Sequence, residues 1–257
     1  MELNLTGRKV LITGASQGIG EGLAQAFATE GCELFLVARS ADKLTRIAAE
    51  LSARHGVAVA TLPIDITAPD AVERIVAFAG NADVLVNNAG NIPSGNLASV
   101  TDDMWRRGWD LKVFGYINLT RAVYQCMKER GGGVIVNIIG AAGEMPDANY
   151  IAGSAGNAAL MAFTHSLGGR SLDDKIRVLG VNPGPVNTDR IKNMLKHRAE
   201  REFGDASRYQ EFLATFPRGR AAEVAEVADL VVFLASDRSS YTSGAVFSVD
   251  GGLKARR

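Results

Sequence analysis

The stretch Val10-Leu-Ile-Thr-Gly-Ala-Ser-Gln-Gly-Ile-Gly20 constrains the fold of this chain most strongly. Residues 9–13 form a short apolar run rich in β-branched side chains, which predicts a buried strand. Residues 18–31 carry apolar side chains at helical spacing, and three glycines lie at the join. Glycines let the backbone approach a ligand closely, and the first N–H groups of a helix attract an anion. The join therefore predicts a turn that binds a pyrophosphate.

The alternation of strand and helix continues along the chain. Alternation at this pace indicates a parallel sheet with right-handed crossovers. At 257 residues with 47% hydrophobic residues, the chain is long enough for one large core. We therefore predict an α/β fold, a doubly wound parallel sheet with helices on both faces, as a single domain over residues 1–257. Strands are expected at 9–13, 33–38, 57–63, 84–87, 134–139, 176–181 and 245–249, and helices at 18–31, 42–55, 69–79, 101–130, 150–169 and 222–235.

The composition restricts the classes of partner that the protein is expected to bind. Lys and Arg together number 28, as do Asp and Glu, so no global field favours nucleic acid or a membrane surface, and we expect a small-molecule partner. Cys32 and Cys126 form no C-x-x-C pair and few histidines accompany them, so we expect free thiols in a cytoplasmic protein and no metal site. The first residues do not show a basic segment followed by an apolar one, and no apolar run approaches membrane-spanning length, so we expect a soluble, cytosolic protein.

The spacing Thr-Gly-x-x-x-Gly-Ile-Gly resembles the cofactor turn of the short-chain dehydrogenase/reductase family. Further family marks follow in order over about the whole chain: Asp65, Asn87-Asn88-Ala89-Gly90, Asn182-Pro183-Gly184 with Thr188, and Asp250-Gly251-Gly252. The resemblance implies a Rossmann-type fold that binds a dinucleotide. In such enzymes the residue equivalent to Asp65 faces the adenine, and the residues equivalent to Asn88-Ala89-Gly90 lie against the ribose. The implied cofactor-binding set is Gly14, Ser16, Gln17, Gly18, Ile19, Gly20, Arg39, Asp65, Ile66, Asn88, Ala89, Gly90, Pro183, Gly184, Val186 and Thr188.

The end of the second strand bears on the choice between NADP and NAD. It reads Val37-Ala38-Arg39-Ser40, about 20 residues beyond the glycine turn. An enzyme that uses NAD would place an acid here to accept a hydrogen bond from the ribose 2′-hydroxyl. Ala38 leaves no acid to repel a 2′-phosphate, and the guanidinium of Arg39 offers a fork to bind one. We therefore predict NADP, with NAD as the alternative if Arg39 is only a solvated loop charge.

The catalytic residues are where the resemblance breaks. The family usually carries an Asn-Ser-Tyr-Lys tetrad, in which the tyrosine protonates a carbonyl as a hydride arrives and the lysine supports it. In residues 109–115 the position of the asparagine is occupied by Lys112, and in residues 136–143 the position of the serine is occupied by Gly140. Alignment without gaps on Ala158-Ala159-Leu160 puts Gly153 at the tyrosine and Asn157 at the lysine, so none of the four is in place.

Three residues are the candidates for a rearranged acid/base set: Tyr150, Lys112 and Asn157. Tyr150 lies three residues before the usual position, displaced by about 60° and 4.5 Å on a helix, with Ser154 at its i+4 position. We expect Tyr150 to donate the proton, and Lys112 to support it, to hold the cofactor ribose or to be the acid itself. The alternatives are a loop aromatic for Tyr150 and a solvated helix lysine for Lys112.

Residues 189–220 are charged and amphipathic, which is compatible with a surface helical pair or, as the resemblance implies, with a lid whose apolar residues line a substrate pocket. Trp105, Met145, Pro146 and the lid phenylalanines would add apolar walls, while Glu144 and Asp147 would suit a substrate with a polar or cationic group. The small residues at 152–156 predict close approach of another helix, and the resemblance implies that this helix and the one from Thr101 pair with their copies in a homodimer or homotetramer.

We therefore expect an NADP(H)-dependent oxidoreductase acting on a carbonyl or a secondary alcohol. Two alternatives from other classes are a catalytically silent dinucleotide-binding sensor or assembly protein, and a non-redox lyase or epimerase on the same fold.

Overall fold

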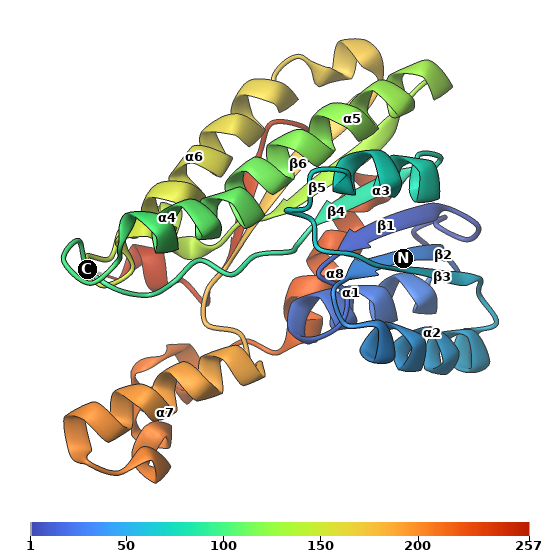
Figure 1. Ribbon diagram of the computed structural model, residues 1–257. Coiled ribbons are helices and arrows are strands. Elements are labelled where there is room, and N and C mark those ends of the chain that lie inside the picture. The colour runs from blue at the N-terminus through green and yellow to red at the C-terminus, as the bar shows by residue number, and fades with distance from the viewer. Residues whose placement is uncertain (1, 257) are drawn as a thin grey trace.

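The computed structural model describes residues 2–256, and a seven-stranded parallel sheet forms its centre (Figure 1). The strand order is β3-β2-β1-β4-β5-β6-β7, so the order reverses between β1 and β4. Val10 of β1 pairs with Leu34 on one side and with Val84 on the other. The strands are β1 (Lys9–Thr13), β2 (Glu33–Ala38), β3 (Val59–Pro63), β4 (Val84–Asn87), β5 (Gly133–Ile138), β6 (Ile176–Pro183) and β7 (Val246–Val249).

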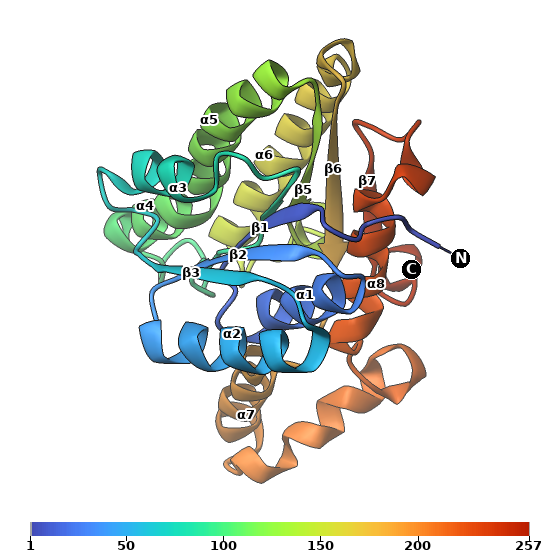
Figure 2. The same cartoon turned by 90° about the vertical axis from the view of Figure 1, so that its right-hand side faces the viewer.

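Helices cover both faces of the sheet, as Figures 1 and 2 show. Helices α1, α2 and α8 bury one apolar cluster against the strands, while α3 and α5 bury a second cluster on the opposite face. Helix α6 lies beside α5 on that second face. The predicted single-domain, doubly wound α/β sheet is therefore confirmed. The helices are α1 (Gly18–Thr29), α2 (Ala41–His55), α3 (Ala71–Ala79), α4 (Asp102–Trp109), α5 (Gly115–Arg130), α6 (Ile151–Gly168), α7 (Asp189–Phe203) and α8 (Val224–Ala235).

The helix predicted over residues 101–130 is not uniform. Thr101 caps its start, since the Thr101 hydroxyl accepts a hydrogen bond from the Met104 N–H at 3.3 Å. Between α4 and α5, however, one π-helical turn spans Asp110–Phe114. Such turns are rare and occur frequently at functional sites. Lys112, a candidate site residue, lies in this turn.

The segment from α7 to the 3₁₀ stretch Ala206–Thr215 extends beyond the layered body (Figures 1 and 2). Its apolar side chains pack against one another, with Leu195, Ala199 and Phe212 at the centre. Phe203 stacks on Phe212 with ring centroids 5.3 Å apart. These residues form a small core of their own, which is the packing that the helical-pair alternative describes. That they also cover a substrate as a lid stays a prediction.

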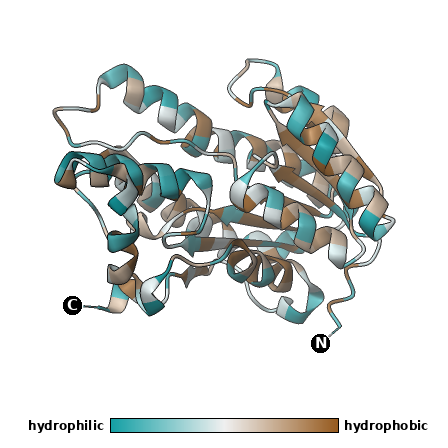
Figure 3. Cartoon of the chain, turned by 90° about the horizontal axis from the view of Figure 1, so that it is seen from below, coloured by the Kyte–Doolittle hydropathy of each residue, from teal (hydrophilic) through white to brown (hydrophobic). Residues whose placement is uncertain are grey.

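The hydropathy of the chain follows the layers. Hydrophobic residues concentrate in the central strands and hydrophilic residues along the outward sides of the helices (Figure 3). Across residues 2–256, no helix has both the length and the apolar character needed to cross a membrane. Neither cysteine forms a disulfide: Cys32 is buried and Cys126 partly exposed.

Candidate functional site

The glycine turn after β1 packs directly against the loop that follows β4. A Cβ on Gly14 would lie 2.9 Å from Cα of Ala89, and one on Gly20 would lie 2.2 Å from the carbonyl oxygen of Gly14. The Asn88 amide donates to the carbonyls of Thr13 at 2.9 Å and Gly14 at 3.2 Å. No larger residue fits these positions, so the backbone of the turn is held close to the edge of the sheet where the strand order reverses.

The N-terminus of α1 leaves its first N–H groups available to an anion. Its N-cap residue, Gln17, makes no side-chain capping hydrogen bond. The Gln17 amide oxygen instead accepts a hydrogen bond from Nζ of Lys43 at 2.9 Å, which brings a cation to the turn. Open helical N–H groups beside a glycine turn fit the pyrophosphate of a dinucleotide. Ser16 lies in the turn and Ile19 in the first helical residues.

The loop after β6 meets the same turn from the other side. A Cβ on Gly18 would lie 3.4 Å from Cγ2 of Thr188, although 170 residues separate them in the sequence. Val186 is buried and its carbonyl accepts the Thr188 N–H at 2.8 Å. Gly184 donates its N–H to the carbonyl of Val249 at 2.9 Å. With Pro183 at the end of β6, these predicted cofactor residues lie together at the carboxyl edge of the sheet.

The ends of β2 and β3 place Arg39 and Asp65 near each other. Arg39 is exposed, and its charge acts on Asp65. The carboxylate of Asp65 accepts hydrogen bonds from the N–H and the hydroxyl of Thr67 at 2.9 and 2.8 Å. These bonds, led by the backbone one, lower the pKa of Asp65 and fix its orientation. Ile66 follows it, partly exposed.

Lys112 extends from the π-helical turn across Gly90. A Cβ on Gly90 would lie 2.8 Å from Cδ of Lys112, and the ammonium donates a hydrogen bond to the carbonyl of Ile139. Protein surrounds the ammonium, although part of the side chain keeps contact with solvent. Burial, assisted by the charge of Arg190, lowers the pKa of Lys112 to about 7. Lys112 is therefore enclosed within the site, and the solvated-lysine alternative does not describe it.

Asn157 reaches the position where the family carries its serine. Gly140 has φ of +135°, and a Cβ there would lie 2.9 Å from Nδ2 of Asn157. Asn157 is 2% exposed, and its Oδ1 is buried without a hydrogen-bond partner among residues 2–256. An orphaned buried acceptor of this kind is costly unless a donor reaches it. A hydrogen-bond donor of a bound ligand would satisfy it.

Tyr150 is the N-cap residue of α6 and turns back over the first turn of that helix. A Cβ on Gly153 would lie 2.0 Å from Cζ of Tyr150, so the ring fills the space above Gly153. Tyr150 and Trp109 both pack against the apolar cluster that contains Ala152, and Trp109 donates its Nε1 hydrogen to the carbonyl of Ala152 at 3.0 Å. Tyr150 is therefore held by packing beside the site.

Arg190 is a site residue that the sequence reasoning missed. Its Nη2 lies 3.4 Å from the hydroxyl of Tyr150 and 3.3 Å from the carbonyl of Ile92. Arg190 also contributes to the lowered pKa of Lys112, so the two cations are close in space. The sequence feature that could have identified Arg190 is its position two residues after Thr188, at the start of α7.

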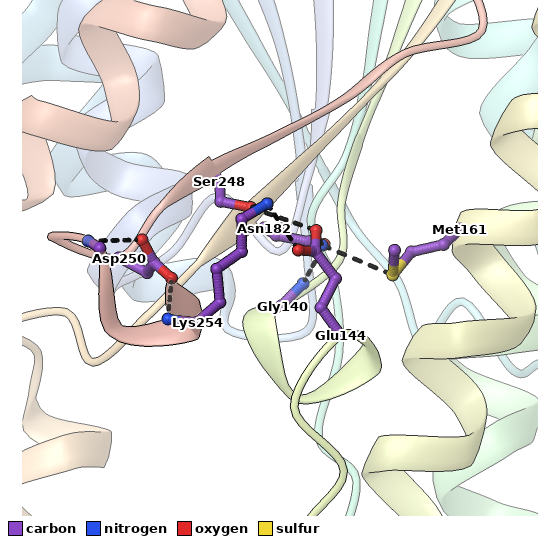
Figure 4. A network of polar contacts seen from close by, with 8 residues as sticks. Gly140, Glu144, Met161, Asn182, Ser248, Asp250 and Lys254 are labelled. Atoms are coloured by element: carbon purple, nitrogen blue, oxygen red, sulfur yellow. Dashed lines mark hydrogen bonds and ion pairs between the residues drawn. The ribbon is translucent and has the colours of Figure 1, made fainter. Parts of the chain in front are cut away.

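Glu144 is not a free carboxylate for a substrate, which corrects the sequence-based expectation (Figure 4). Its Oε2 accepts a hydrogen bond from Nζ of Lys254 at 2.6 Å, and its Oε1 accepts from Nδ2 of Asn182 at 2.7 Å and from the hydroxyl of Ser248 at 3.1 Å. Burial favours the protonated form, but the hydrogen bonds, led by that from Lys254, hold the pKa of Glu144 below its ordinary value. Asn182 also accepts the Gly140 N–H at 3.2 Å, so the network braces the loop after β5.

The small residues of α6 allow close packing within the chain. A Cβ on Gly156 would lie 3.1 Å from Val113 and 3.2 Å from both Ile92 and Trp109. The expected close approach of another helix is confirmed, and that helix is the α4–π segment of the same chain. Side chains of the same chain therefore cover Gly153 and Gly156.

The fold and the glycine turn define a dinucleotide-binding α/β protein, and the comparisons name its family. Residues 8–199 match the family model for short chain dehydrogenases. The oxidoreductase UcpA of Salmonella typhimurium is 36% identical over 253 residues, 96% of this chain and 95% of that protein. The chain belongs to the short-chain dehydrogenase/reductase family, and it is an oxidoreductase of this NAD(P)-dependent type.

Two solved structures are similar along nearly the whole chain. The L-sorbose reductase of Gluconobacter frateurii, complexed with NADPH and L-sorbose, has a TM-score of 0.92 and 33% identity, with 100% of both chains covered. A 7α-hydroxysteroid dehydrogenase complexed with NADH has a TM-score of 0.86 and 27% identity, with 98% of this chain and 96% of the other covered. Neighbours of this chain thus bind either form of the nicotinamide cofactor.

Proposed function

We propose that the protein is an NADP(H)-dependent oxidoreductase that interconverts a carbonyl and a secondary alcohol with a rearranged acid/base set. The observation that carries the proposal is Lys112, whose side chain passes over Gly90, whose ammonium donates to the carbonyl of Ile139, and whose pKa is lowered to about 7. A group with a pKa near the working pH is the most effective general acid or base. Lys112 can therefore give up and regain a proton under neutral conditions.

In this proposal three side chains act on the reacting carbonyl. A bound nicotinamide supplies or accepts the hydride. Lys112 gives its proton to the carbonyl oxygen and takes it back in the reverse direction. Tyr150, held against Arg190, donates a hydrogen bond that orients the carbonyl. Asn157 offers its buried amide in place of the family's serine, and its orphaned Oδ1 accepts a hydrogen bond from a ligand hydroxyl.

The preference for NADP rests on two cations at the adenosine end. Arg39 is exposed at the end of β2, and Lys43 lies at the glycine turn through its bond to Gln17. No acidic residue stands between Val37 and Ser40 to accept the 2′-hydroxyl of NAD. Guanidinium and ammonium groups at this position suit a 2′-phosphate.

The experiment that tests the function follows NADPH absorbance with a panel of ketones and oxo acids, for wild type and for Lys112→Met and Tyr150→Phe. Lys112→Met should lower turnover by about 10²–10⁴-fold, the usual effect of removing a general acid. Tyr150→Phe should cost less, because it removes one orienting hydrogen bond. A wild type that binds NADPH and turns over no member of the panel contradicts the proposal and favours a silent binding protein.

We also propose a homodimer or homotetramer in the cytoplasm, with residues 189–220 as a lid. Arg190 supports the lid because it ties the start of α7 to Tyr150 and to the carbonyl of Ile92. The solvent-exposed Phe114, 48% accessible beside α5, supports a partner surface on that helix. Sedimentation at micromolar concentration tests the assembly, and a monomer there contradicts it.

A further inference from the structure

Two positive side chains meet at the catalytic face without an acidic partner. Arg190 contacts only neutral oxygens, those of Tyr150 and Ile92, and Lys112 contacts the carbonyl of Ile139. Within residues 2–256, none of the ion pairs includes either residue. Arg190 is exposed at the start of α7, so a ligand can reach its guanidinium. Because two like charges placed close together repel each other, an anion bound beside them would be stabilised by both.

The nearest acids on the loop after β5 do not supply that anion. Glu144 is paired with Lys254 at 2.6 Å. Asp147 accepts the N–H of Asn149 at 2.8 Å, which turns its carboxylate to its own loop. A ligand that carries negative charge is therefore the natural partner of Arg190, whose planar guanidinium matches a carboxylate in two parallel hydrogen bonds.

We propose that the substrate carries a carboxylate that pairs with Arg190, close to the carbonyl that receives its proton from Lys112. The inference deepens the oxidoreductase function proposed above and rests on it. Proximity of the two cations places the carboxylate and the carbonyl in one short segment of the substrate, as in a small oxo acid. Trp105 and Tyr150 belong to one apolar cluster beside Arg190, so an apolar or aromatic body fits next to the charged end.

The test compares benzoylformate, an aromatic oxo acid, with its uncharged amide. Binding of each to the NADPH-loaded protein is measured by calorimetry, and reduction is followed by NADPH absorbance. Wild type should bind the acid at least about tenfold more tightly than the amide, as expected for a charge-assisted hydrogen bond. Arg190→Gln should abolish most of this preference, and Arg190→Lys, which keeps the charge but loses the second parallel hydrogen bond, should retain part of it. Lys192→Gln is the matched control, an exposed charge in the same turn of α7, and should leave the preference unchanged.

Three outcomes overturn the proposal. Wild type without preference for the acid overturns it, as does an unchanged preference in Arg190→Gln. If Arg190→Gln instead weakens NADPH binding about tenfold while the preference survives, the anion is a phosphate of the cofactor. Preferential binding of the acid with no NADPH oxidation supports the anion site and contradicts the redox function, so the two failures are distinguishable.

Discussion

A Cβ atom on Gly153 would lie 2.0 Å from Cζ of Tyr150, so the ring of Tyr150 occupies the space that any side chain at 153 would need. Gly153 stands where the family carries its tyrosine. The missing aromatic ring is thus replaced by one that enters from the N-cap of α6, three residues earlier. The two residues form a matched pair, because neither can change without disturbing the other.

This pairing predicts an unusual response to alanine. Gly153→Ala should destabilise the protein by about 1–3 kcal/mol, the cost of overpacking, although alanine ordinarily favours a helix over glycine by about 1 kcal/mol. In a Tyr150→Ala background the same substitution should stabilise the fold, because the space is then open. Denaturant unfolding of the four variants measures the coupling. Stabilisation by Gly153→Ala in both backgrounds would be inconsistent with the pairing.

The family's serine should not be restorable at position 140. Gly140 has φ of +135°, which L side chains rarely adopt, and Asn157 lies 2.9 Å from the Cβ it would gain. Gly140→Ala should therefore be more destabilising than Gly56→Ala, where φ is +69° and nothing lies within 4 Å. Adding Asn157→Ala should reduce the destabilisation that Gly140→Ala causes. Equal costs at positions 140 and 56 would show that Asn157 does not fill that space.

The fold was predictable from the sequence because its signals are local. Periodicity gave the strands 33–38 and 84–87 exactly, and the glycine spacing gave the turn at α1. The π-helical turn at Asp110–Phe114 was not predictable, since residues 101–130 have the sequence pattern of one continuous helix. The packing of residues 189–220 on themselves was equally hidden, because an amphipathic pattern does not reveal which surface covers it.

The candidate site was only partly predictable. Alignment to the family identified Lys112, Gly140, Gly153 and Asn157 as the altered positions, and the structure places them near one another. Arg190 and Lys43 were missed because their roles depend on contacts over distances of 40 and 26 residues, to Tyr150 and Gln17. The neutralisation of Glu144 by Lys254, 110 residues away, likewise has no local signal.

The lowered pKa of Lys112 has a consequence for stability. Between pH 7 and the ordinary lysine value of 10.5, the unfolded chain binds more protons at this residue than the folded chain. Below about pH 7 the buried ammonium therefore lowers the unfolding free energy of the cofactor-free protein by its full amount. This penalty is relieved as the pH rises toward 10.5. The difference in unfolding free energy between Lys112→Met and wild type should shrink by at most about 1.4 kcal/mol per pH unit in this window. A difference that stays constant from pH 7 to 10 would contradict the burial of the charge.

Removing the cation at the adenosine end of the site should weaken the binding of one cofactor selectively. Arg39→Ala should weaken NADPH binding by about ten- to a hundredfold, since a hydrogen bond to a charged group contributes about 1.5–3 kcal/mol, and should leave NADH binding nearly unchanged. Titration of both cofactors by fluorescence measures this. Arg74→Ala serves as the control, because that arginine is exposed on α3 and paired with Asp70. Equal NADPH and NADH affinities in wild type would refute the preference for NADP.

The most direct test of Lys112 as the proton donor is the pH dependence of kcat/KM for carbonyl reduction by NADPH, measured for wild type, Lys112→Met and Lys112→Arg. With Lys112 as the donor, wild-type kcat/KM should fall as the pH rises through about 7, because kcat/KM reports the pKa of the enzyme before the substrate binds. Both variants should be about 10²–10⁴-fold slower and lack this transition, since arginine keeps its charge but cannot release a proton at neutral pH. If Lys112→Met keeps the kcat/KM and the pH profile of the wild type, the proton donor is another group.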